Sequence, residues 1–272
     1  MTEGGWRALR EWPRASAASA YHRLRRSRLI GPMIMRAIEA RLDGATTARV
    51  TVRAGPLRGM SLDIDPRVQA DVVLGVYERR LSRHALGVLR EGHTAFDVGS
   101  HLGYFALLMA TAVGASGSVV CFEPNDSLHA ALDGNVRRNR DLIRADVSIS
   151  RTAVGAVSGS TTFFKHDRST RGRLGSGGET RVDVTTLDEA AEAFGSPRFV
   201  KIDVEGGEID VLSGAPRLLA ARTCGFGIEI HSPELGAGCA ALLRDHGYVC
   251  RSVRDRGRLE SYLLAEPSGR QD

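Results

Sequence analysis

Residues 94–104, TAFDVGSHLGY, place a glycine turn between an apolar run and a second apolar segment. The pattern predicts a strand that enters a turn and then a helix, because Gly99 and Gly103 let the backbone bend and approach a ligand closely. In a doubly wound sheet, ligands bind at such turns, beyond the carboxyl ends of the strands. This stretch therefore predicts an α/β fold with a ligand site at the turn.

The ligand at this turn is not expected to be a dinucleotide. A dinucleotide turn reads G-x-G-x-x-G and holds a pyrophosphate on a helix N-terminus. This turn reads D-V-G-x-x-x-G, with Ser100 and His101 in place of the middle glycine. Asp97 would repel a pyrophosphate but suits a cationic or amino-bearing ligand.

A second acidic residue narrows the ligand further. The next strand candidate ends at Glu123, 26 residues after Asp97. An acid at the end of this strand typically binds ribose hydroxyls. A ligand with a ribose, a positive charge, an amino group and no pyrophosphate is S-adenosylmethionine, which we expect as the cofactor.

Strand-like and helix-like segments alternate through the body of the chain, which predicts a mostly parallel sheet covered on both faces. Two consecutive strands at the end predict that one strand is antiparallel. The strand-like segments are 94–99, 118–123, 147–154, 181–187, 198–204, 225–231, 248–253 and 259–265, and the helical ones are 102–112, 126–138, 188–194, 207–220 and 234–246. Residues 155–180 form a polar, glycine-rich stretch with a short strand candidate at 160–165.

The N-terminal part differs from the body in charge. Residues 1–58 hold 12 arginines against four acids, net +8, whereas the whole chain carries +5. We expect an extension over 1–67, with helices before a hairpin of 48–53 and 57–64, and a cofactor-binding domain over 68–272 that opens with helical residues 68–90. The basic extension suits contact with a membrane surface or an anionic partner, but we favour a solvated helical extension or an oligomer contact.

Composition predicts an ordinary globular protein, with 42% hydrophobic and 25% charged residues. No apolar run reaches the ~20 residues of a membrane-spanning helix, and arginines interrupt any signal-peptide pattern. The four cysteines have no metal-type spacing, so we expect reduced thiols. We therefore predict a cytoplasmic protein; its oligomeric state cannot be predicted from these patterns.

Several motifs in order resemble the FkbM family of S-adenosylmethionine-dependent methyltransferases. They are GVYE, DVGSHLGYF, CFEPN, TAVG, VTTLDE, FVKIDVEGGEIDVLSGA and IEIH, spread over roughly residues 60–255. The resemblance implies a Rossmann-like class I methyltransferase sandwich, with a seven-stranded, mostly parallel sheet whose last strand is antiparallel. It also implies O-methylation of sugar, polyketide or lipid-linked hydroxyls. His101 departs from the family, where a small polar residue or asparagine is more frequent.

The resemblance and the turn chemistry together define the expected cofactor site. Its members are Tyr77, Glu78, Asp97, Gly99, Ser100, His101, Gly103, Tyr104, Glu123, Pro124, Asn125, Ala153, Val154 and Asp203.

The expected catalytic residues are Asp203, His231 and Glu205. An alcohol is a weak nucleophile, so a positioned base speeds methyl transfer by about 10²–10⁴-fold. Asp203 and Glu205 are two residues apart and face the same way if their strand stays extended. Glu229 and His231 form a second such pair on the next strand. His231 has a suitable pKa for a base, or is a hydrogen-bonded residue of the pocket wall, and Asp203 alternatively orients the cofactor amino group.

Two neighbouring residues receive structural roles. We expect Glu208 to cap the following helix, where a carboxylate is favoured. Lys201 is expected to be a strand-end cation paired with a carboxylate. Asp203, Glu205, Glu229 and His231 also carry the donors of a Mg or Mn site, although nothing in the sequence requires a metal and we expect none.

Two other functions remain as alternatives. An RNA 2′-O-methyltransferase would carry a Lys-Asp-Lys-Glu tetrad, but Lys165 and Lys201 are the only lysines. A catalytically inactive cofactor-binding scaffold is disfavoured by the intact Asp97, Gly99, Gly103 and Glu123. We expect a small-molecule hydroxyl substrate and no nucleic-acid partner.

Overall fold

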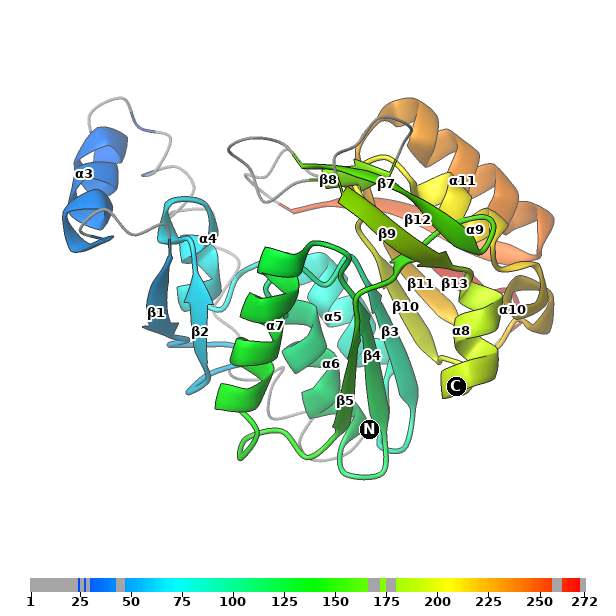
Figure 1. The fold of residues 1–272 in the computed structure, drawn as a ribbon, viewed down its shortest axis with the longest axis horizontal. Coiled ribbons are helices and arrows are strands. Elements are labelled where there is room, and N and C mark those ends of the chain that lie inside the picture. Colours follow the sequence, from blue (N-terminus) through cyan, green and yellow to red (C-terminus); the bar gives the residue numbers. More distant parts are fainter. Residues whose placement is uncertain are drawn as a thin grey trace.

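The chain forms a three-layer α/β sandwich that carries two small accessory sheets (Figure 1). The computed structural model describes Leu24, Ser27 and residues 30–42, 47–165, 172–174, 180–255 and 261–269. The helices are α3 (Ile30–Leu42), α4 (Pro66–Val73), α5 (Arg79–Val88), α6 (Tyr104–Val113), α7 (Asp126–Arg138), α8 (Leu187–Phe194), α9 (Glu208–Ser213), α10 (Pro216–Ala221) and α11 (Pro233–Asp245).

The central sheet has seven strands in the order β12-β13-β11-β10-β3-β4-β5. The pairs β3–β4, β4–β5, β3–β10 and β10–β11 are parallel, and β13 is antiparallel to both of its neighbours. The predicted class I sheet with its antiparallel last strand is confirmed. These strands are β3 (Thr94–Val98), β4 (Ser118–Phe122), β5 (Asp146–Ser150), β10 (Phe199–Ile202), β11 (Gly225–Ile230), β12 (Tyr248–Arg254) and β13 (Ser261–Pro267).

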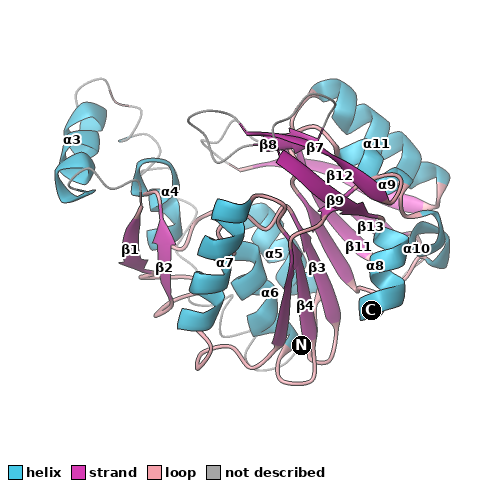
Figure 2. Cartoon of the chain, viewed as in Figure 1, coloured by secondary structure: helices cyan, strands magenta, loops and turns pink. Residues whose placement is uncertain are grey.

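Alternate residues of each strand pack into two separate cores. Ala95 belongs to the core beneath α5, α6 and α7, whereas Phe96 and Val98 belong to the core beneath α8 to α11. Figure 2 shows the two groups of helices on opposite sides of the magenta sheet. Both faces of the sheet are therefore buried, as the nearly continuous apolar strands predict.

The switch point of the sheet lies between β3 and β10. From β3 the chain builds outward through β4 to β5, and it then returns to add β10 on the other side of β3. The carboxyl ends of β3 and β10 are thus neighbours at the point where such folds bind ligands.

The described parts of residues 153–185 contribute four strands to a second sheet. Its order is β6-β9-β7-β8, with β6 (Ala153–Val154), β7 (Gly159–Lys165), β8 (Gly172–Leu174) and β9 (Thr180–Thr185). In Figure 1 this sheet lies toward the end of the molecule where the parallel strands terminate. The predicted strand at 160–165 and the extended segment at 181–187 are confirmed in large part.

Three predicted elements are interrupted. The helix predicted at 68–90 is two helices, α4 and α5, because Gly75 has φ +65° and its Cα packs so tightly that an added Cβ would lie 1.9 Å from the Ala54 carbonyl oxygen. The helix predicted at 207–220 is α9 and α10, since Pro216 starts a new helix. The strand predicted at 147–154 is β5 and β6, which pair in different sheets.

The predicted hairpin at 48–64 is confirmed, with β1 (Ala48–Thr51) antiparallel to β2 (Ser61–Ile64). Two buried asparagines attach it to the body: Asn135 of α7 and Asn139, which follows the last residue of that helix. Asn139 and Asn135 each exchange a pair of hydrogen bonds with the β2 backbone, at Ser61 and Asp63. Asn135 also donates to the Leu102 carbonyl of the glycine turn at 2.9 Å, so the hairpin and the turn share one anchor.

Removing this anchor is expected to destabilise the protein. Asn135→Ala leaves the Asp63 amide and the Leu102 carbonyl without their buried partner, which costs about 1–3 kcal/mol of unfolding free energy. Urea denaturation measures the loss. Arg137→Ala, at an exposed position of the same helix, should change stability by no more than about 0.5 kcal/mol. Equal stability of the two variants would contradict the anchoring role.

The N-terminal extension is described only in part. Helix α3 lies next to α4, at the left of Figure 1, and the helices predicted before it lie outside the described residues. Within the described part of the chain, no helix is long and apolar enough to cross a membrane. The boundary at residue 67 stays a prediction, as does the cytoplasmic location. The four cysteines are free thiols, as predicted.

Candidate functional site

The glycine turn and the end of β10 touch each other directly. The Asp203 amide donates to the Val98 carbonyl at 3.0 Å. Gly99 has φ +76°, and a Cβ at this position would lie 1.8 Å from the Asp203 carbonyl oxygen. Only glycine allows this contact, so the sequence choice at Gly99 fixes the distance between the two halves of the site.

Asp97 and Lys201 form a buried pair beneath the turn. Asp97 is fully buried, Lys201 is 3% exposed, and Lys201 Nζ lies 3.5 Å from Asp97 Oδ1. Lys201 also donates to the Gly99 carbonyl at 2.7 Å and to Asp203 Oδ2 at 3.4 Å. The predicted role of Lys201 as a strand-end cation is confirmed, with two carboxylates rather than one.

The acids around Lys201 make this part of the site negative. Burial opposes the charge of Lys201, but Asp203, Asp97, Glu78 and Glu229 outweigh it and raise the pKa, so the ammonium stays charged. Burial raises the pKa of Asp97, and Lys201 opposes that shift. Neither Asp97 oxygen accepts a hydrogen bond of good geometry from the described residues. The negative charge of Asp97, shared with Lys201, suits a cationic or amino-bearing ligand near the turn.

Glu123 closes the other side of the turn. Its two carboxylate oxygens accept hydrogen bonds from the backbone amides of His101 and Asn125, each at 2.9 Å. Burial raises the pKa of Glu123 to about 7, although the two amide hydrogen bonds oppose the shift. The carboxyl group is thus held in place by the backbone and titrates near neutral pH.

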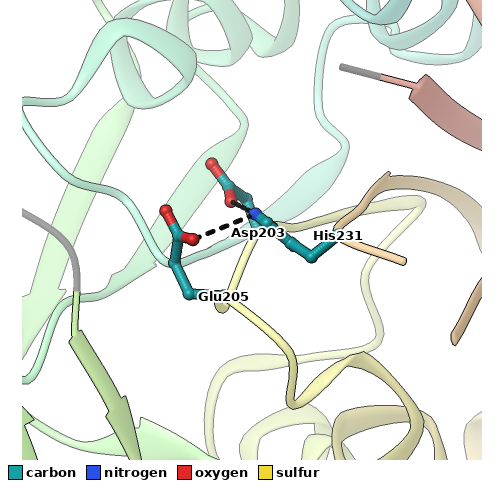
Figure 3. Close-up of side chains that lie close together, drawn as sticks. All are labelled: Asp203, Glu205 and His231. Atoms are coloured by element: carbon teal, nitrogen blue, oxygen red, sulfur yellow. Dashed lines mark ion pairs between the residues drawn. The ribbon is translucent and has the colours of Figure 1, made fainter. Parts of the chain in front are cut away.

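His231 lies at the centre of a carboxylate cluster, shown in Figure 3 with two of its partners. The Nδ1 atom is 2.6 Å from Glu208 Oε1, and Nε2 is 3.3 Å from Glu205 Oε2 and 3.6 Å from Asp203 Oδ1. Burial lowers the pKa of His231, but the Glu208 hydrogen bond and the nearby charges of Asp203 and Glu205 raise it by more. The predicted catalytic residues Asp203, Glu205 and His231 therefore lie together.

Asp203, Glu205 and His231 converge through a turn and not through the extended strand considered in the sequence analysis. Strand β10 ends at Ile202, and Glu205 has φ +55°, so this segment does not stay extended. The turn through Glu205 and Gly206 carries the Glu205 carboxylate back toward the end of β11, where His231 follows Ile230. The expectation of an extended segment was wrong, although the side chains still converge.

The sequence interpretation missed the partner of His231. Glu208 was expected to cap α9, and its Oε1 does accept from the Gly206 amide at 2.9 Å. The same oxygen also holds His231, and the Glu208 side chain is fully buried. The sequence did contain a signal for this role. Glu208 of the KIDVEGGE motif shares the helical spacing of the apolar residues Val211 and Leu212, which indicates a buried acid that needs a partner. Glu229 is a buried member of β11 and does not belong to the cluster of possible metal ligands found in the described residues.

The other predicted cofactor residues surround the turn. Tyr77 and Tyr104 stack edge to face with ring centres 4.8 Å apart, and Glu78 is buried in a left-handed conformation at the start of α5. Ser100 donates to the Asp97 carbonyl at 2.7 Å, and Gly103 precedes α6. Pro124 lies between Glu123 and Asn125, and Asn125 caps α7. Contact of these residues with a cofactor stays a prediction.

Two predicted cofactor residues lie in β6. Ala153 and Val154 are buried side chains of β6, and Val154 packs into the core beneath α8 to α11. His101 has φ +50°, in the left-handed region that asparagine, aspartate and histidine adopt more readily than most residues. Gln69 lies 3.5 Å from its ring.

The sequence matches a known protein family. Residues 97–257 match the family described as the methyltransferase FkbM domain, which is more than half of the chain. This chain belongs to the FkbM methyltransferase family. The match spans both acids of the turn and the whole carboxylate cluster, so the FkbM resemblance predicted from the motifs is confirmed.

Individual relatives cover part of the chain. The hexuronic acid methyltransferase AglP of Haloferax volcanii is 29% identical over 159 residues, which are 57% of this chain and 63% of AglP. This FkbM-family chain thus aligns with less than two thirds of AglP. A solved methyltransferase FkbM of Methylobacillus flagellatus KT is 15% identical with a TM-score of 0.48, covering 72% of this chain and 60% of that one. A SAM-dependent O-methyltransferase of Thermotoga maritima is 14% identical with a TM-score of 0.45, covering 72% and 68%.

Proposed function

We propose that this FkbM-family protein is an S-adenosylmethionine-dependent O-methyltransferase that acts on a hydroxyl of a small molecule. The observation that carries the proposal is the convergence of Asp203, Glu205 and His231 beside the glycine turn. A donor bound at the turn and an acceptor hydroxyl bound at the cluster would meet at the switch point between β3 and β10.

The turn fits S-adenosylmethionine by charge and by hydrogen bonding. Asp97 places a buried negative charge beneath the turn, near the expected amino-acid end, and Glu123 offers a fixed carboxyl group to the ribose. A dinucleotide would place a pyrophosphate beside Asp97, which electrostatics disfavours. S-adenosylmethionine, when bound, supplies a methyl group that is already activated on a sulfonium.

The protein's task is then to place the acceptor and to receive its proton. Asp203 and Glu205 accept a hydrogen bond from the acceptor hydroxyl and hold its oxygen toward the glycine turn. The proton passes into the hydrogen-bonded group of Asp203, Glu205, His231 and Glu208, whose members share it as one coupled system. Positioning and proton uptake of this kind contribute about 10²–10⁴-fold in rate.

A sugar is the acceptor class that the relatives favour. AglP is named for a hexuronic acid, and its similarity supports a sugar or a lipid-linked glycan over a polyketide. An RNA acceptor is less consistent with the site, because Lys201 is buried against Asp97 and Asp203 and does not face a substrate. We therefore propose that the acceptor is a small glycan-type molecule and not a nucleic acid.

Calorimetry and mass spectrometry test this function. The protein should bind S-adenosylmethionine with measurable heat and prefer it to NAD. With a panel of hydroxylated sugars, uronic acids, polyketides and glycolipids, mass spectrometry should detect a gain of one methyl group. Cofactor heat without methyl gain on any acceptor would indicate an inactive cofactor-binding scaffold. Absence of cofactor heat, or preference for NAD, would overturn the assignment.

Cofactor affinity should also depend on pH through Glu123. Its pKa of about 7 means that the carboxyl is largely protonated at pH 6 and ionised at pH 8. The ionised carboxylate accepts hydrogen bonds from ribose hydroxyls more strongly than the protonated form. The affinity for S-adenosylmethionine should therefore rise between pH 6 and 8, by about tenfold for each unit by which binding lowers the pKa of Glu123.

Calorimetric titrations of the wild type and two variants measure this effect. Glu123→Gln keeps the shape of the side chain but cannot titrate, so the rise in affinity between pH 6 and 8 should flatten. Any titration of the cofactor itself affects both proteins equally, so the difference between them reports Glu123. Glu123→Ala should weaken binding at every pH. A wild type and a Glu123→Gln protein with the same pH dependence would rule out Glu123 as the ribose partner.

A further inference from the structure

We propose that Asp203, Glu205 and His231 form a binding site for one divalent first-row cation, for which Mn²⁺ is the best-matched probe. One donor atom of each residue lies within 4.8 Å of the other two (Figure 3). Cation binding at these atoms can be measured without any methyl transfer.

The distances between the donor atoms match a ligand set. Nε2 of His231 is 3.3 Å from Glu205 Oε2 and 3.6 Å from Asp203 Oδ1. Ligands at about 2.1 Å from a metal are separated by about 3.0 Å in octahedral and about 3.4 Å in tetrahedral geometry. The Asp203 and Glu205 oxygens lie within 4.8 Å of each other, so a cation bound at Nε2 draws these two carboxylates closer together.

Glu208 orients the imidazole for this role. Its Oε1 lies 2.6 Å from Nδ1, so a neutral imidazole keeps its proton on Nδ1 and directs the Nε2 lone pair toward Asp203 and Glu205. Carboxylate–histidine–metal arrangements fix a ligating histidine in the same way. This lone pair faces two carboxylates, and the repulsion is relieved by a positive charge between them, either a proton on Nε2 or a bound cation.

The local charge also favours a cation. Asp203, Glu205 and Glu208 supply three negative charges around one imidazole. Glu208 is fully buried and its Oε2 accepts no hydrogen bond from the described residues, although the carboxylate faces His231. Lys201 lies between Asp97 and Asp203 and donates to the Gly99 carbonyl, so its charge is already divided. A single proton on His231 balances one carboxylate, whereas a divalent cation balances two.

Two oxygens and one nitrogen favour a first-row cation over Mg²⁺ or Ca²⁺, which prefer oxygen alone. Three protein ligands leave positions open for water or for hydroxyl and carboxylate oxygens of a substrate. On the basis of the function proposed above, a bound sugar acid would find there the positive charge that the carboxylate cluster itself lacks.

Mn²⁺ titration of the full-length chain tests the site. After treatment with EDTA and desalting, free Mn²⁺ measured by electron paramagnetic resonance should reveal one saturable site, with Mg²⁺ competing weakly. Glu205→Gln and His231→Gln should each weaken Mn²⁺ binding by at least about tenfold, and Glu208→Gln by about 10–100-fold. Asp210→Asn, at an exposed position of α9, should leave it unchanged.

The outcomes separate the cation site from the methyltransferase proposal. Thermal melting and S-adenosylmethionine heat establish that each variant is folded. Wild-type protein that binds S-adenosylmethionine but no Mn²⁺ would overturn the cation site alone. Mn²⁺ binding that survives all three substitutions would place the ion elsewhere and equally overturn the assignment. Saturable Mn²⁺ binding without S-adenosylmethionine heat would support the site and reject the proposed function.

Discussion

Asp203→Asn is expected to lower the methyl-transfer rate by about 10²–10⁴-fold while changing S-adenosylmethionine affinity by much less. The substitution keeps the size of the side chain and removes its charge. The asparagine can no longer take part in proton uptake from the acceptor, and it loses the ionic contacts with Lys201 and His231 at 3.4 and 3.6 Å. Asp97 remains beside Lys201, so the buried ammonium keeps one carboxylate partner.

Single-turnover kinetics and calorimetry separate the two effects. The first reports the chemical step and the second the cofactor dissociation constant. Asp210→Asn is the matched control, since it removes an exposed acid seven residues further along the same segment. It should retain wild-type turnover. An equal loss of turnover and cofactor affinity in Asp203→Asn would show that Asp203 serves the cofactor and not the acceptor.

The sequence was sufficient to predict elements whose ends carry strong local signals. Helix α7 begins and ends where predicted, at 126 and 138, because Asn125 caps its first turn. Thr186 and Glu189 form a capping box at the start of α8, whose helix was predicted at 188–194. The seven-stranded sheet followed from apolar runs of strand length, which are buried on both faces wherever helices flank a parallel sheet.

The breaks inside elements could not be predicted because they depend on distant contacts. Gly75 interrupts the helical pattern at 68–90 through a close approach to Ala54, which lies in the upstream hairpin connection. Residues 151–152 divide one strand pattern between two sheets, since the neighbour of β6 is β9, about 30 residues downstream. Such pairings are tertiary and leave no mark in local periodicity.

The site was predictable in composition but not in geometry. Parallel neighbours β10 and β11 bring Asp203 and His231 to the same edge of the sheet, as their positions after two strands predict. The left-handed turn at Glu205 and the contact between Glu208 and His231 depend on side-chain and backbone conformations that the sequence leaves open. The sequence therefore predicted the capping contact of Glu208 but not its contact with His231.

Gly99→Ala is expected to be among the most destabilising single substitutions in this protein, at roughly 3–5 kcal/mol. Alanine is strained at φ +76°, and its Cβ would lie 1.8 Å from the Asp203 carbonyl oxygen. That oxygen cannot move away freely, because the Asp203 amide is bonded to Val98 and fixes the residue at the strand end. Relief requires β3 and β10 to separate at the switch point, which displaces Asp97 and Asp203 together.

Urea denaturation of three proteins measures this prediction. Gly134→Ala is the matched control, because Gly134 lies within α7 and an added Cβ there meets nothing within 4 Å. It should stabilise the protein by about 0.5–1 kcal/mol through helix propensity. If Gly99→Ala is too unstable to purify, the amounts of soluble protein obtained for Gly99→Ala and Gly134→Ala can be compared instead. A much lower yield of Gly99→Ala would give the same order of stability. A Gly99→Ala protein that unfolds at the wild-type urea concentration would show that the turn and β10 do not approach as closely as described, and the proposed meeting of donor and acceptor at the switch point would lose its geometric basis.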